Sequence, residues 1–276
     1  MSEAIDGVRL DDPSDGCGSR PLPAVLMYHS VAPYDQDPYL VTVRPARFEQ
    51  QLRWLDRRGL RGTSMRELLA ARREGADRRL VGLTFDDGYA DFAEHVLPAL
   101  ARFGFTATVF VIADLLGGCN SWDEEGPRKA LMTADQIRQV AASDMEIGSH
   151  GRRHVSLTSI DDSDGSAVLD VLTAEVAGSR TILQEVSGQE VSGFCYPYGH
   201  LDALAVNAVR SAGYRYGCAI WRSQLTGLHA LPRTYIGDRD GSLRLLAKWY
   251  RHQLRYRQHL RSRQDRRGRG QRHQPV

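Results

Sequence analysis

The stretch Gly82–Phe92, GLTFDDGYADF, joins a short apolar run to two adjacent carboxylates and a glycine. The run Val81–Phe85 has the length and composition of a buried strand, and an Asp-Gly pair is typical of the turn that ends one. A turn needs only one aspartate, and two neighbouring carboxylates repel each other. The pair Asp86 and Asp87 therefore indicates a role beyond the turn, provided that the rest of the chain supplies partners.

Outward from this stretch, strands alternate with helices along the chain. A helix with Phe92, Val96, Leu100 and Phe103 on one face follows the aspartates, and a strand over 106–112 comes next. The other predicted strands are 24–28, 145–148, 194–196, 215–220 and 231–236, and the other predicted helices are 45–58, 133–142, 165–186, 201–212 and 243–260. Strands that recur with helices between them indicate a parallel sheet. About seven such units predict a closed or nearly closed α/β barrel.

Composition is typical of a globular protein. The chain has 276 residues, of which 42% are apolar and 25% charged. The longest clear apolar run, Ala107–Ala113, suits a buried strand and is too short to span a membrane. The acidic N-terminus has no apolar core, so no secretory signal is predicted and we expect a cytoplasmic protein. The four cysteines form no C-x-x-C pair, which indicates reduced thiols.

Charge is distributed unevenly and defines the expected domains. The segment 248–276 holds ten Lys or Arg against one acid, an excess of +9 that leaves −7 on the preceding body. We expect a disordered segment over 1–22, a barrel domain over 23–247, and a basic helix with a disordered tail over 248–276. An anionic partner for the tail is one interpretation, and a solvated terminus without a fixed partner is the favoured one. No specific nucleic-acid binding is expected.

A histidine pair is the first candidate partner for the aspartates. In EIGSHGRRHVSL, His150 and His154 are four residues apart, just after the strand 145–148, and a helical turn would bring them onto one face. In a parallel barrel this strand end meets the one that carries Asp86 and Asp87. Two imidazoles and one carboxylate leave a coordination position open for water, as in catalytic metal sites. The second aspartate is then free to act as a general base.

Three motifs together resemble a known family. LTFDDGY, SHGRRH and the later FCYPYG, in this order, are similar to motifs of the polysaccharide deacetylases, the NodB-homology enzymes of carbohydrate esterase family four. The resemblance covers roughly Ala24 to Ile236. It implies a distorted (β/α) barrel of about seven strands that removes N- or O-acetyl groups from sugars. It also implies one divalent metal ion, with zinc expected and cobalt, nickel or manganese as alternatives.

The resemblance assigns roles to residues of this chain. It implies that Asp86 is the catalytic base and that Asp87, His150 and His154 are the metal ligands. The backbone N–H of Tyr198 would bind the oxyanion. Further candidates for contact with the sugar are Tyr196 and Pro197 in the FCYPYG loop and Asn120 and Trp122 in the long polar loop 114–129, although the latter two are equally suited to anchoring that loop.

The chain departs from the family pattern in its third motif and in its general acid. Cys195 stands where the family has an arginine that orients the base, so we expect Asp86 to have a less depressed pKa and the enzyme a more alkaline activity profile. The late L-x-H motif survives only as His229, with Gly227 in place of leucine. His29, in VLMYHSV, resembles the N-terminal histidine of the poly-N-acetylglucosamine-type branch, and we favour it as general acid.

The predicted function is therefore metal-dependent removal of N-acetyl groups from an amino-sugar-containing glycan or glycoside of bacterial type. Two alternatives use the same barrel. One is hydrolysis of an O-acetyl ester or a cyclic imide at the same site, which no sequence feature separates from amide hydrolysis. The other is a non-catalytic barrel that binds an anionic partner through its basic tail.

Overall fold

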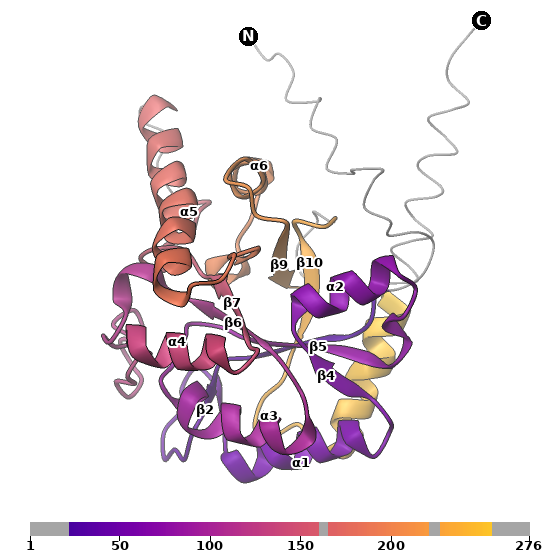
Figure 1. Ribbon diagram of the computed structural model, residues 1–276. Helices are drawn as coiled ribbons and strands as arrows, with labels where there is room; N and C mark the ends of the chain where they lie inside the picture. The colour runs from indigo at the N-terminus through magenta and orange to yellow at the C-terminus, as the bar shows by residue number, and fades with distance from the viewer. Residues whose placement is uncertain (1–21, 160–164, 221–226, 256–276) are drawn as a thin grey trace, which may run out of the picture.

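A closed parallel barrel forms the centre of the protein (Figure 1). The computed structural model describes residues 22–159, 165–220 and 227–255. Its main sheet has the strand order β1-β10-β9-β8-β7-β6-β5-β4, and an additional β1–β5 pairing closes seven of these strands into a ring. The strands are β1 Val25–Tyr28, β4 Arg61–Thr63, β5 Leu80–Phe85, β6 Thr108–Val111, β7 Glu146–Ser149, β8 Gly193–Cys195, β9 Tyr216–Ile220 and β10 Leu231–Tyr235. The predicted α/β barrel is confirmed.

Helices lie around the outside of the strands (Figure 1). They are α1 Pro45–Asp56, α2 Met65–Arg73, α3 Leu97–Phe103, α4 Ala134–Ala142, α5 Gly165–Ser187 and α6 Ala203–Ser211, with a π-helix at Phe92–Val96 and 3-10 turns at Asp77–Arg79, Ala113–Leu115 and Pro197–Gly199. A small parallel sheet pairs β2 Ser30–Val31 with β3 Thr42–Val43. Since helices cover the barrel strands, β1, β5, β6 and β7 are buried along their whole length.

The closing pair of strands carries an aromatic cluster on its outer face. Tyr28 in β1 is in register with Phe85 in β5, and their rings stack with centroids 5.1 Å apart. Phe48 of α1 packs edge-on against Tyr28 with centroids 5.4 Å apart, and Phe92 does so against Phe85 at 5.0 Å. This packing fixes the carboxyl end of β5, and therefore the position of the two aspartates that follow it.

Four elements, β2, β3, β4 and α2, are absent from the sequence prediction. The strands β2 and β3 have only two residues each, and β4 is the short, partly exposed stretch RGT without an apolar run. α2 begins at Ser64, whose side chain accepts a hydrogen bond from the N–H of Glu67. The predicted N-cap of α4 is confirmed, since Thr133 and Gln136 form a capping box.

The folded body also extends past the predicted domain boundaries. Leu22, assigned to the disordered N-terminal segment, is fully buried. A helical segment over residues 242–255 crosses the predicted boundary at 247, and its His252 is buried with Nε2 3.2 Å from the carbonyl oxygen of Leu22. The rest of the predicted N-terminal segment and the tail from 256 onward lie outside the described residues. Among the described cysteines, Cys119, Cys195 and Cys218 are free thiols.

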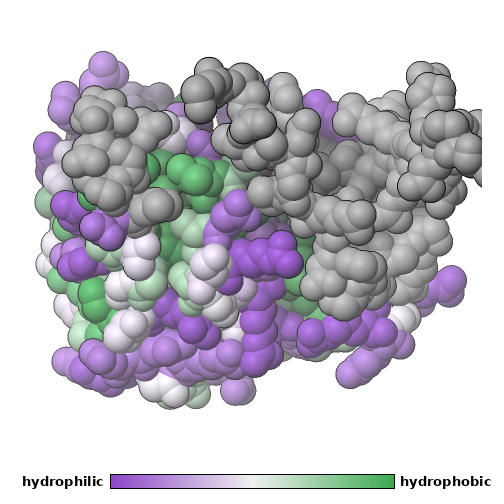
Figure 2. All heavy atoms as spheres, turned by 90° about the horizontal axis from the view of Figure 1, so that it is seen from above, coloured by the Kyte–Doolittle hydropathy of each residue, from purple (hydrophilic) through white to green (hydrophobic). Residues whose placement is uncertain are grey.

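The helices in the described part of the chain do not meet the requirements of a membrane span. None of its helices combines the length and the apolar character that crossing a bilayer requires. On the face shown in Figure 2, hydrophilic residues lie along the lower edge and extend into the middle, where hydrophobic residues lie beside them. Cytoplasmic localisation stays a prediction.

Candidate active site

Side chains from several strand ends converge at the carboxyl rim of the barrel. His29 follows β1, Asp86 and Asp87 follow β5, His150 follows β7, and the 3-10 turn with Tyr198 follows β8. The sequence prediction that these strand ends meet at one rim is confirmed by the ion-pair distances among the first four of these residues. The site therefore depends on the barrel for its assembly and draws on segments that are far apart in the chain.

Asp87 lies at the centre of a buried cluster with the two histidines. Its Oδ1 is 3.3 Å from Nε2 of His150 and 3.4 Å from Nε2 of His154. All three residues are buried, and their ligand atoms lie within 4.8 Å of one another. Burial alone would raise the pKa of Asp87, but the contacts with both imidazoles outweigh burial and hold it well below its usual value.

The backbone that presents this cluster is a loop, and the predicted helical turn between the two histidines is wrong. Gly151 has φ 79° and His154 has φ 60°, and neither value is compatible with an α-helix. Asp87 and Tyr198 also have positive φ, at 71° and 58°. Such left-handed conformations cost roughly 1–3 kcal/mol each in residues other than glycine and gather at functional sites.

The cluster fits a tetrahedral metal such as zinc. His150 holds its Nδ1 2.8 Å from the carbonyl oxygen of Cys195, so Nδ1 carries the proton and the Nε2 lone pair faces Asp87. Two ligand atoms bound to zinc at ~2.0–2.1 Å in a tetrahedron lie about 3.3 Å apart, which matches the Asp87 to histidine distances. Nδ1 of His154 is buried without a hydrogen-bond partner among the described residues.

A second trio, Asp86, His150 and Cys195, also has its ligand atoms within 4.8 Å. It fits a metal less well, because both carboxylate oxygens of Asp86 are already engaged by Arg233 of β10. The two guanidinium nitrogens lie 2.6 and 2.8 Å from these oxygens. Burial also raises the pKa of the Cys195 thiol, which keeps the sulfur protonated. Asp87, His150 and His154 are therefore the better ligand set.

Arg233 corrects the expectation that Asp86 lacks a neighbouring cation. Its guanidinium is buried, donates to Oγ1 of Thr84 at 3.1 Å, and lies 3.0 Å from Sγ of Cys195. Burial would raise the pKa of Asp86, but the charge and hydrogen bonds of Arg233 outweigh it and lower this pKa below its usual value. The arginine missing at position 195 is thus supplied from another strand, and the basis for a more alkaline activity profile is removed.

His29 and His229, the two candidates for the general acid, lie at opposite ends of the barrel. Nε2 of His29 is 3.9 Å from Oδ2 of Asp86, and its Nδ1 is buried without a partner among the described residues. His229 precedes β10 at its amino end, and its Nε2 is 2.9 Å from the carbonyl oxygen of Tyr214, which precedes β9. The structure therefore brings His29 to the site and leaves His229 away from it.

Two aromatic rings cover the outer side of His154. Trp122, from the loop 114–129, packs on the imidazole with centroids 4.4 Å apart, and Tyr198 packs on it at 4.6 Å. Tyr198 is half exposed, and no hydrogen bond among the described residues occupies its backbone N–H. The half-exposed ring of Tyr198 thus lies beside the metal-ligand cluster.

The other residues expected to contact the sugar are buried inside the protein. Tyr196 is 1% exposed and its hydroxyl donates to the carbonyl oxygen of His229, so its side chain packs inside the protein. Asn120 is buried, and its amide bonds Asp123, Pro127 and Lys129 within its own loop. Pro197 is buried as well.

The architecture described above is a barrel with carboxylates and imidazoles at one rim. Comparison with known proteins agrees with it. A family model described as "Polysaccharide deacetylase" matches residues 73–217, more than half of the chain. The chain belongs to the polysaccharide deacetylase family, and the prediction of a deacetylase of the NodB-homology type is confirmed at this level.

Individual relatives are distant but cover most of the chain. The protein YxkH of Bacillus subtilis is 26% identical over 219 residues, which is 77% of this chain and 70% of YxkH. The poly-β-1,6-N-acetyl-D-glucosamine N-deacetylase of Staphylococcus epidermidis is 21% identical over 216 residues, 75% of this chain and 72% of that protein.

Solved structures share the fold. The Streptococcus pyogenes deacetylase PplD, solved in complex with acetate, has a TM-score of 0.67 at 24% identity, covering 82% of this chain and 97% of PplD. A de-N-acetylase from Aggregatibacter actinomycetemcomitans has a TM-score of 0.69 at 19% identity, covering 82% of this chain and 98% of that one.

Proposed function

We propose that this protein is a metal-dependent hydrolase that removes N-acetyl groups from an amino-sugar-containing glycan or glycoside. The observation that carries the proposal is the division of the adjacent aspartates: Asp86 is held by Arg233, whereas Asp87 faces His150 and His154. Asp86 is thus oriented as a base, and Asp87 contributes to a metal-ligand set beside it. The N-acetyl substrate is further supported by the name of the Staphylococcus relative.

Each polar group has a task in amide hydrolysis. When bound by Asp87, His150 and His154, a divalent ion supplies the Lewis acid that polarises the acyl carbonyl and acidifies water. Asp86 accepts the proton of the attacking water, and Arg233 keeps its carboxylate in place. The N–H of Tyr198 donates to the oxyanion of the tetrahedral intermediate. His29 gives a proton to the departing amine, which yields acetate and a free amino sugar.

The test is acetate release by the full chain from N-acetylglucosamine oligomers, measured after removal of metal by a chelator and after reloading with zinc, cobalt, nickel or manganese. We expect activity to disappear with the metal and to return on reloading. O-acetylated sugars are assayed in parallel. Release from these sugars alone would replace the amidase with an esterase, and activity that survives complete metal removal would contradict metal dependence.

The general acid is tested by a matched pair of substitutions. His29→Gln is expected to lower kcat by roughly 10²–10⁴-fold, because glutamine cannot protonate the amine. His229→Gln is expected to stay close to wild type, since its Nε2 bonds a backbone carbonyl at the other end of the barrel. An equal loss in both variants, or a loss confined to His229→Gln, would reverse the assignment.

A further inference from the structure

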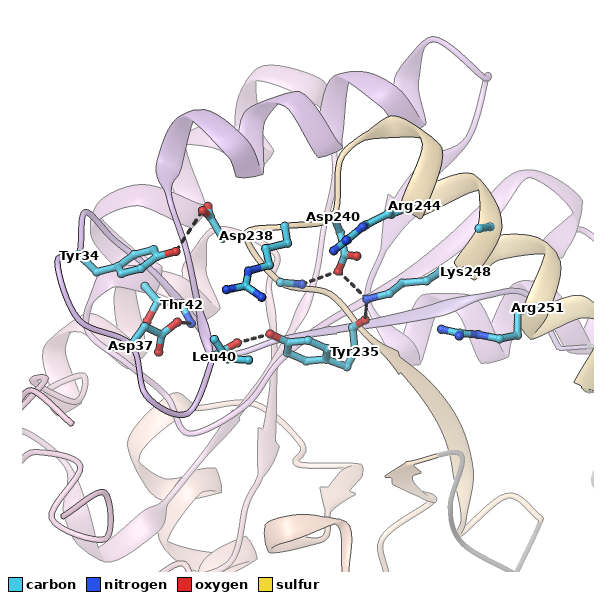
Figure 3. Close-up of a pocket in the computed structure, with 13 residues that line it drawn as sticks. Tyr34, Asp37, Leu40, Thr42, Tyr235, Asp238, Asp240, Arg244, Lys248 and Arg251 are labelled. Atoms are coloured by element: carbon cyan, nitrogen blue, oxygen red, sulfur yellow. Dashed lines mark hydrogen bonds and ion pairs between the residues drawn. The ribbon is translucent and has the colours of Figure 1, made fainter. Parts of the chain in front are cut away.

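A second concave site lies beside the carboxyl rim. A pocket of about 610 Å³ is formed by the loop between β2 and β3, the turn after β10 and the helical segment 242–255 (Figure 3). Its volume falls within the roughly 300–1,000 Å³ that is typical of small-molecule sites. Neither the proposed metal ligands nor Asp86 line it.

Four basic side chains are part of the lining of this pocket. Arg244, Lys248 and Arg251 are spaced four and three residues apart on the helical segment, which places them on one face of the helix, and Arg239 comes from the turn after β10. The guanidinium groups of Arg239, Arg244 and Arg251 make no hydrogen bond or ion pair with another described residue. All three residues are exposed, so these guanidinium groups remain available to a ligand.

The acidic residues of the same pocket are already engaged. Asp238 pairs with Arg44 and accepts from the Tyr34 hydroxyl, and Asp240 pairs with Lys248. Asp37 accepts hydrogen bonds from the backbone N–H groups of Val41 and Thr42. With Asp238 and Asp240 neutralised by these ion pairs, only Asp37 opposes the three guanidinium groups. The lining of the pocket therefore has an excess of positive charge.

The pocket shares strand β10 with Arg233, the arginine that holds Asp86. Tyr235, which lines the pocket, follows Arg233 by two residues in β10, so their Cα atoms are roughly 7 Å apart. Tyr235 is also in register with Met27 of β1, two residues before His29. When a glycan places its acyl group beside Asp86, a neighbouring part of the glycan therefore lies close to this pocket.

We propose that the pocket binds an anionic group, a phosphate or a carboxylate, carried by the glycan substrate close to the sugar that is deacylated. Guanidinium groups bind either oxyanion through paired hydrogen bonds, whereas a neutral sugar offers them no charge to balance. This inference rests on the proposed deacetylase function, and it narrows the substrate to an acidic glycan.

The experiment measures binding separately from catalysis. Isothermal titration of the full chain with N-acetylglucosamine 6-phosphate, with a glucuronate-N-acetylglucosamine disaccharide and with N-acetylglucosamine compares the two anions with a neutral sugar. We expect at least one anionic probe to bind roughly tenfold more tightly than the neutral one, and to weaken as salt is added. Arg244→Gln and Arg251→Gln should each remove most of this preference.

Arg73→Gln is the matched control, because Arg73 is an exposed arginine of α2 outside the pocket. Acetate release from neutral oligomers should remain within about twofold of wild type in both pocket variants. Equal binding of all three probes, or an equal loss in Arg73→Gln, would overturn the inference. If the wild type releases no acetate but still prefers an anionic probe in an Arg244-dependent manner, the deacetylase proposal fails while the anion site stands.

Discussion

Asp86→Asn is expected to lower kcat for acetate release by roughly 10²–10⁴-fold while the bound metal is retained. Asparagine has nearly the shape of aspartate but cannot accept the proton of the attacking water. Both oxygens of Asp86 face Arg233, so the substitution leaves the ligand set of Asp87, His150 and His154 intact. Metal content by elemental analysis and initial rates on N-acetylglucosamine oligomers provide the two readouts.

Comparison of His150→Ala with Asp86→Asn distinguishes a metal ligand from a catalytic base. We expect it to abolish activity as well, but to lose the metal, because one of the two imidazoles that face Asp87 is removed. Cys195→Ser tests the competing trio and should retain the metal. Loss of metal from Asp86→Asn or Cys195→Ser would move the ion to the group formed by Asp86, His150 and Cys195.

Arg233→Met is expected to cause the second large effect, on both activity and stability. The substitution leaves the buried carboxylate of Asp86 without its cation, and breaking a buried ion pair in this way costs roughly 3–5 kcal/mol of folding free energy. Arg233 lowers the pKa of Asp86, and the base acts only when deprotonated, so activity falls as the pH decreases through this pKa. Without the guanidinium the pKa rises, and the acid limb of kcat/KM should move to higher pH.

A double variant distinguishes an effect through Asp86 from general damage. If Arg233 acts by orienting and charging the base, Asp86→Asn/Arg233→Met should be little less active than Asp86→Asn alone. Arg233→Lys keeps the charge but loses the paired hydrogen bonds, so it should preserve the pH profile better than methionine does. An unshifted acid limb in Arg233→Met would contradict the role given to this arginine.

The sequence predicted the features that local pattern determines. The apolar run and the carboxylates of Gly82–Phe92 identified β5 and the site at its end, and the spacing of His150 and His154 identified the candidate ligands. The loop that joins the histidines was missed, because left-handed backbone at His154, a residue other than glycine, leaves no mark in a spacing pattern. β4 was missed because three residues carry no periodicity.

Arg233 was missed for a different reason. Its contact with Asp86 spans 147 positions and depends on the closure of the barrel and on the register of β10, neither of which a local pattern contains. One signal was present in the sequence. The predicted strand 231–236 contains an arginine, strands of a parallel barrel are largely buried, and a buried cation needs an acidic partner.

Because Arg233 lies in the last strand of the barrel, its pairing with Asp86 can form only late in synthesis. The carboxylates, both imidazoles and the FCYPYG loop leave the ribosome before β10 does, since β10 follows them in the chain. β10 then inserts between β9 and β1 and brings the guanidinium to Asp86. A chain that ends before residue 231 lacks the guanidinium that holds Asp86 and the strand that joins β9 to β1. If Asp86 is the base that we propose, an incompletely synthesised chain is therefore inactive until its last barrel strand is in place.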